Sequence, residues 1–203
     1  MIYPDHYLPE DSSVSQSNRK IEKSASKKKD RSAQVEKQRT APPSPHEVVM
    51  NKVRNLLQAG KAEEAFDLLN ARGFNDPDSR NARAVCLLRM GQPELAVRAL
   101  REICLTANGT MVKPDVPTHY ATNLAAALFS AGNVTGSVAV LDDLARDYAP
   151  SVAQMRGLVR EWEGELSFWQ RLKWKCGLDP GLATANYNVP IALDPSDDDS
   201  VLV

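Results

Sequence analysis

A short motif occurs three times along the chain: a glycine, a polar gap, a small residue and then an aliphatic residue. The three copies read QAGKAEEAFDLL (58–69), RMGQPELAVRAL (89–100) and SAGNVTGSVAVL (130–141). Glycine ends a helix at little cost, because it adopts left-handed backbone conformations that other residues avoid. The repetition therefore predicts three helical hairpins that bend at Gly60, Gly91 and Gly132.

Aliphatic side chains on both sides of each bend recur at steps of three and four residues, as in an amphipathic helix. Before the first bend the pattern is Val49, Val53, Leu56 and Leu57, and similar runs surround the other two bends. β-Branched residues are sparse, and we identify no alternating run that would favour a strand. The sequence therefore predicts an all-α fold.

The spacing of the bends resembles the tetratricopeptide repeat, a helix–turn–helix unit of about 34 residues. Successive bend glycines lie 31 and 41 residues apart, on either side of that period. Matching residues cover about 46–150: Leu56, Gly60, Ala65, Leu69 and Pro77; Ala84, Leu87, Gly91, Ala96 and Leu100; Leu124, Ala125, Leu128, Gly132, Leu141 and Pro150. Another kind of helical hairpin array is the alternative.

The resemblance implies an α–α superhelix of three hairpins closed by a long terminal helix, with a concave groove that binds a peptide or helix. The groove residues that it implies are Asn51, Arg54, Asn81, Arg89, His119, Asn123 and Phe129. Met50 and Arg54 replace the Lys and Asn with which some members bind a C-terminal carboxylate, so that ligand is not expected. The arginines and asparagines would instead bind acidic groups or peptide backbone.

The sequence predicts one long final helix over 151–176, with Ser151 as its N-cap and a stop at Gly177. Trp162 and Trp169 fall on its apolar face and are expected in the core. Trp174 falls off that face among cations. Either residues 178–191 fold back and cover Trp174, or Trp174 contacts a protein partner or a membrane together with the neighbouring Arg171, Lys173 and Lys175.

Charge divides the chain into three parts. Residues 19–40 hold nine basic and three acidic side chains, whereas 179–203 hold five aspartates and no Lys or Arg. We therefore predict a disordered basic segment over 1–45, a helical domain over 46–178 and a disordered acidic tail over 179–203. A loop over 106–118 either borders the groove or connects two hairpins without binding anything.

Catalytic patterns are absent from the sequence. The three histidines have no partner at metal-ligand spacing, and the cysteines form no C-x-x-C pair. No phosphate-binding glycine loop or nucleophile elbow appears. We expect no catalytic, cofactor or metal site, and a chain that is not an enzyme.

The expected partner is therefore a protein or peptide bound by a non-enzymatic adaptor. Nucleic acid is not expected, because the basic segment carries no aromatic residues for base stacking. The start of the sequence lacks a secretory pattern and no apolar stretch reaches a membrane-spanning length, so a cytoplasmic location is expected. A peripheral membrane protein and a homo-oligomeric structural subunit, both using the Trp-rich final helix, are the alternatives.

Overall fold

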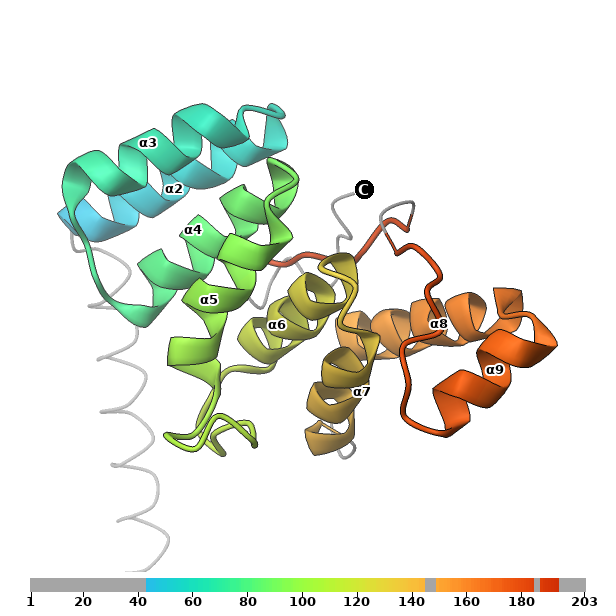
Figure 1. Ribbon diagram of the computed structural model, residues 1–203. Coiled ribbons are helices and arrows are strands. Elements are labelled where there is room, and N and C mark those ends of the chain that lie inside the picture. Colours follow the sequence, from blue (N-terminus) through green and yellow to red (C-terminus); the bar gives the residue numbers. More distant parts are fainter. Residues whose placement is uncertain (1–42, 145–148, 185–186, 194–203) are drawn as a thin grey trace, which may run out of the picture. The chain divides into compact units, whose positions relative to one another are not determined.

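The structure, a computed structural model, describes residues 43–144, 149–184 and 187–193. The chain divides after Ser44, and the description below concerns the unit that begins at Pro45. Its helices are α2 (Pro45–Gln58), α3 (Ala62–Arg72), α4 (Pro77–Arg89), α5 (Pro93–Cys104), α6 (Thr118–Ser130), α7 (Val134–Asp143), α8 (Pro150–Glu165) and α9 (Phe168–Lys175) (Figure 1). No strand occurs among the described residues, so the predicted all-α fold is confirmed. Most of the predicted basic segment and the last ten residues of the acidic tail lie outside them.

The three glycines stand at the bends between helices, as predicted. Gly60, Gly91 and Gly132 have φ values of 74°, 69° and 81°, which is the left-handed region that favours glycine. They join α2 to α3, α4 to α5 and α6 to α7. Three hairpins of helices are therefore present.

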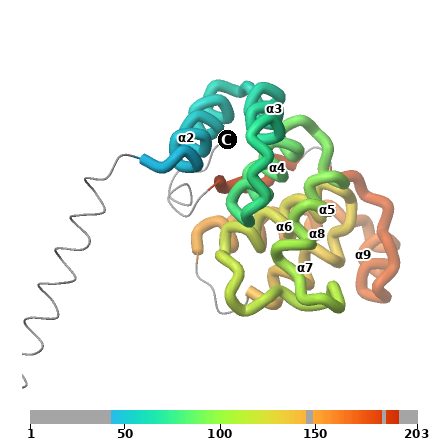
Figure 2. The backbone as a smooth tube through the Cα atoms, turned by 90° about the vertical axis from the view of Figure 1, so that its left-hand side faces the viewer, coloured from blue at the N-terminus to red at the C-terminus, as the bar shows by residue number. Residues whose placement is uncertain are grey.

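The helices pack in the order of the sequence. Each of α2 to α7 contacts the next helix along the chain, and α7 contacts α8. The first helices of successive hairpins also touch, since α4 contacts both α2 and α6, and α6 contacts α8 as well. Figures 1 and 2 follow this order from blue α2 to orange α9. The superhelical arrangement itself stays a prediction.

Two apolar clusters form the core of this unit. One lies among α2, α3 and α4, around Val53 and Leu69, and the other lies among α4 to α8, around Phe129 and Trp162. Helix α6 has every residue from His119 to Phe129 buried. A helix that is buried on all sides must pack against several elements at once, so α6 is the central helix of the second cluster.

The loop over 106–118 lies against the second helices of two hairpins. The main-chain N–H of Val112 donates to Asp143 of α7 over 2.8 Å, and Lys113 donates to the carbonyls of Glu102 and Ile103 at the end of α5. Lys113 thus satisfies carbonyls that a helix end leaves free. These contacts connect the second hairpin to the third.

The prediction of one long final helix is wrong, because the chain breaks between α8 and α9. Leu166 is extended, and Ser167 and Gln170 form a capping box that starts a new helix. Ser151 is not an N-cap either: it lies inside α8, which starts at Pro150 after Ala149. Ser151 and Gly177 set the ends of the predicted helix, and the apolar spacing between them carries no information about a cap inside the run.

The break changes the environment of the three tryptophans. Trp162 is 1% exposed, as predicted for the core, whereas Trp169 is 70% exposed and its predicted burial is wrong. Trp174 instead packs on Trp162, with ring centroids 5.2 Å apart, and its indole N–H donates to Glu163. Restarting the helix at Ser167 turns Trp169 outward and Trp174 inward.

Candidate functional site

Residues 187–193 cross from α6 to α4 as an extended segment (Figure 1). We call residues 187–193 the C-terminal segment. Ala192 and Leu193 are each 5% exposed, so the packed part of the chain continues past the predicted domain end at residue 178. The side chains that hydrogen-bond to this segment come from two of the three hairpins.

Asn123 of α6 binds the main chain of the C-terminal segment with both ends of its amide. Its Nδ2 donates to the carbonyl of Ala192 over 2.7 Å, and its Oδ1 accepts from the N–H of Ala192 over 3.0 Å. A side-chain amide that pairs with the main-chain N–H and carbonyl of one residue recognises the main chain and not the side chain. This geometry suits any residue that fits the space.

Asn81 of α4 extends the same network. Its Nδ2 donates to the carbonyl of Leu193 over 3.2 Å, and its Oδ1 accepts from Nδ2 of Asn123 over 2.9 Å. Both asparagines are fully buried. We call them the amide pair. Buried amides need partners, and here the C-terminal segment supplies three of the four hydrogen bonds.

Apolar contacts flank the amide pair on both sides. The ring of Tyr187 meets Phe129 edge to face at 5.6 Å, and Val189 packs against the cluster around α6. Leu193 belongs to the cluster formed by α2, α3 and α4. The C-terminal segment therefore spans both apolar clusters, with its main chain held between them.

A pocket of about 430 Å³ lies beside the C-terminal segment at the bends of the first two hairpins. Gly60, Gly91 and Arg89 line it together with Val189 and Ile191 of the segment. The Nε of Arg89 is buried and meets no hydrogen-bond acceptor within the described part of the chain. Arg89 is the one basic residue among those that line the pocket, which also include Ser130 and Asn188.

The structure brings together some of the predicted groove residues. Asn81, Asn123 and Phe129 all contact the C-terminal segment, and Arg89 lines the adjoining pocket. The remaining three make other contacts: Arg54 donates to Asn51 within α2, and His119 is buried against the ring of Tyr120.

Sequence reasoning missed the C-terminal segment as a bound element. Its sequence gives little signal, because Pro190 and Ala192 interrupt the polar positions of any alternation, and the buried residues are Pro190, Ala192 and Leu193. The dense aspartates that follow it favour the prediction of a solvated tail.

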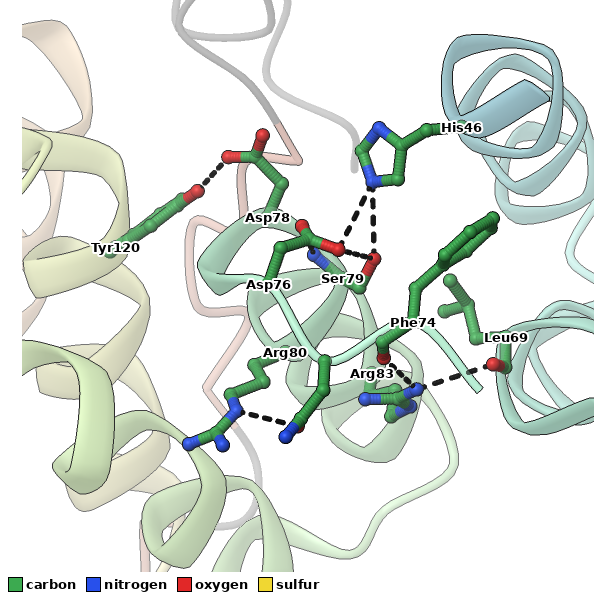
Figure 3. Close-up of polar contacts among 10 residues, drawn as sticks. His46, Leu69, Phe74, Asp76, Asp78, Ser79, Arg80, Arg83 and Tyr120 are labelled. Carbon is green, nitrogen blue, oxygen red and sulfur yellow. Dashed lines mark hydrogen bonds and ion pairs between the residues drawn. The ribbon is translucent and has the colours of Figure 1, made fainter. Parts of the chain in front are cut away.

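A second polar network fixes the start of α4 (Figure 3). Asp76 is the N-cap, accepting from the main-chain N–H of Ser79 over 2.9 Å and from its hydroxyl over 2.8 Å. Nε2 of His46 lies 3.2 Å from the Ser79 hydroxyl and 3.3 Å from Asp76. In a catalytic relay the histidine lies between the serine and the aspartate and contacts each with a different ring nitrogen. Here one histidine nitrogen contacts both groups, and the serine donates directly to the aspartate. The network is therefore a helix cap that joins α2 to α4.

Two further contacts in Figure 3 join α4 to its neighbours. The hydroxyl of Tyr120 on α6 donates to Asp78. Burial, and to a smaller extent this contact with Asp78, holds the pKa of Tyr120 well above its usual range. Arg83 donates to the carbonyl of Leu69 in the last turn of α3 and to that of Phe74 in the loop that follows. Together they fix α4, and with it Asn81, between α2, α3 and α6.

We expect Asp76→Ala to lower the free energy of unfolding by about 1 kcal/mol at pH 7, which is typical of a lost N-cap. Burial acts to raise the pKa of Asp76, but the hydrogen bonds from Ser79 and the charge of His46 outweigh it and hold the pKa below its ordinary value of 3.8. A lowered pKa stabilises the fold above pH 3.8, and that stabilisation is lost as the pH falls further. Urea unfolding across pH 2–7 measures this.

Asp76→Asn is the matched control, because asparagine caps a helix about as well as aspartate but carries no charge. It should retain most of the stability at pH 7 and lack the acid-dependent part. If Asp76→Ala and wild type unfold alike at pH 7, the cap contributes nothing.

An exposed apolar patch lies on α9. Phe168, Trp169 and Leu172 are 75%, 70% and 47% exposed, and Lys173 and Lys175 are exposed beside them. Of the predicted contact residues, Arg171 instead donates to the carbonyls of Gly164 and Leu166 at the end of α8, and Trp174 packs inward. A partner or membrane contact at this helix therefore would involve Phe168 and Trp169, and it stays a prediction.

The described ranges contain no group of three metal-ligating side chains, and none of their helices has the length and apolar character needed to cross a bilayer. Burial raises the pKa of Cys86 and Cys104 to about 12, which leaves both thiols protonated at neutral pH.

Comparison of the chain with protein-family models, with curated proteins and with solved structures gave no match. The tetratricopeptide resemblance thus stays a prediction that rests on the residues that carry it.

Proposed function

We propose that this chain is a non-enzymatic interaction scaffold that holds an extended polypeptide segment on α4 and α6 by its main chain. The observation that carries the proposal is the amide pair, which makes three hydrogen bonds to Ala192 and Leu193. Binding through main-chain groups supplies affinity for many sequences, whereas the flanking apolar positions select among them.

The placement of the site supports this proposal. The amide pair stands on the first helices of the second and third hairpins, and these helices contact each other. In a tetratricopeptide-like superhelix, which we propose for this unit, those helices line the concave side. The left-handed glycines at the three bends and the contacts between successive first helices both favour that arrangement.

We place the scaffold in the cytoplasm. All three cysteines are free, including the exposed Cys176. Free thiols are typical of a reducing compartment.

Panning a peptide-display library on the full chain tests the proposal. The bait carries Leu193→Asp, which buries a carboxylate among apolar side chains and should displace the C-terminal segment. We expect the enriched peptides to be extended and uncharged, and to bind about tenfold or more weakly when Asn123→Leu is added, because each hydrogen bond is worth about 1 kcal/mol.

Asn51→Leu on the same bait is the matched control, because Asn51 is exposed on α2 and contacts Arg54. It should leave the affinity unchanged. Enriched peptides that bind the Asn123→Leu bait as tightly as the parent would count against main-chain recognition by the amide pair.

A further inference from the structure

We infer that the C-terminal segment is a ligand of the amide pair in cis, so a partner segment binds α4 and α6 only by displacing it. This inference rests on the proposed function and adds the ligand class and its control. The site is already occupied, and its occupant belongs to the same chain.

The C-terminal segment and a partner segment cannot bind the amide pair at the same time, because both need the same atoms of Asn123. Nδ2 of Asn123 has two hydrogens, one donated to Ala192 and one to Asn81, while its Oδ1 accepts from Ala192. The remaining donor of the pair, Nδ2 of Asn81, binds the carbonyl of Leu193. A second main chain would find no donor of Asn123 left for it.

The bound segment shows which ligands fit. From Tyr187 to Leu193 it carries no charge, with aliphatic side chains on both sides of Ala192. Ala192 itself is 5% exposed, so a larger side chain at that position would collide with its surroundings. The ligand class is therefore an extended, uncharged segment with a small residue between two aliphatic ones.

Tethering makes the cis ligand effective even when its intrinsic affinity is modest. A segment tethered to its site within one chain acts at an effective concentration of about 1 mM. If the free peptide binds the open site with a dissociation constant of about 10 μM, the cis segment weakens its apparent affinity about 100-fold.

The competition can be measured with a fluorescein-labelled peptide of the sequence 187–193, blocked at both ends. Its affinity is determined by fluorescence anisotropy for the full-length chain, for Leu193→Asp and for Ala192→Pro. The proline removes the N–H that donates to Asn123 and so opens the site by an independent route. Asn188→Asp is the matched control, since it adds the same charge to the same segment at an exposed position.

We expect Leu193→Asp and Ala192→Pro to bind the peptide about 30- to 100-fold more tightly than wild type and Asn188→Asp. Adding Asn123→Leu to either opened variant should abolish this gain. Amide exchange of α4 and α6 in each variant verifies that the helices stay folded, and either opened variant suffices.

Two results would overturn the inference, and they separate it from the proposed function. Equal, measurable affinity for wild type and both opened variants would mean that the site binds peptide but the C-terminal segment does not block it. No binding to a folded, opened variant would mean that this segment is not a ligand, while library selection still decides whether other peptides bind.

Discussion

Asn123→Leu should release the C-terminal segment and lower the free energy of unfolding by about 2–3 kcal/mol. The substitution removes three hydrogen bonds and leaves the main-chain groups of Ala192 and the Oδ1 of Asn81 without partners. An orphaned buried group costs about 1–3 kcal/mol, but release of the segment into water limits the total. A loss of about 2.7 kcal/mol corresponds to the 100-fold cis occupancy estimated above.

Urea unfolding of the full chain measures this loss, and Asn188→Leu is its matched control. Asn188 lies in the same segment but is exposed, so the same substitution should change stability by about 0.5 kcal/mol or less. A cost below about 0.5 kcal/mol for Asn123→Leu as well would show that the amide pair does not hold the segment.

Trp162→Ala should have the largest effect on stability, about 3–5 kcal/mol. Trp162 is 1% exposed and contacts the rings of Phe129 and Trp174 edge to face, with centroids 6.4 Å and 5.2 Å away. Its removal leaves a cavity among α6, α8 and α9 that rigid neighbours fill only in part.

Trp169→Ala is the comparison that makes this measurement informative. Trp169 is 70% exposed after the chain breaks at Ser167, so we expect a change of about 0.5 kcal/mol or less. A continuous helix over 151–176 would instead place both tryptophans on one buried face. Similar losses for the two variants in urea unfolding would therefore contradict the break between α8 and α9.

Much of the fold was predictable because helices leave a local signature. The apolar periodicity gave the helices, and Gly60, Gly91 and Gly132 gave the bends. The final helix was not predicted correctly, because Trp169 and Leu172 continue the apolar spacing of α8. The local capping box of Ser167 and Gln170 outweighs that spacing, and its four-residue pattern is easily overlooked inside an apolar run.

The sequence predicts the residues that form the candidate site but not the segment that occupies it. Asn81 and Asn123 follow from their positions on the first helices of hairpins, which the repeat pattern supplies. Their occupant does not follow, since Ala192 lies 69 residues from Asn123 and Leu193 lies 112 residues from Asn81. No helical period or spacing in one sequence reports a contact over that separation, and Pro190 and Ala192 break the alternation that would have indicated an extended segment at 187–193.

The amide hydrogen of Ala192 gives the most direct test that the C-terminal segment occupies the amide pair. Its exchange rate in the full-length wild-type chain can be followed by NMR and compared with that of Asn188, which is exposed in the same segment. Because the Ala192 N–H donates to a fully buried Asn123, we predict exchange slowed about 100-fold relative to an unstructured chain. Exchange of Ala192 at the unstructured rate, while the amides of α6 stay protected, would contradict this account.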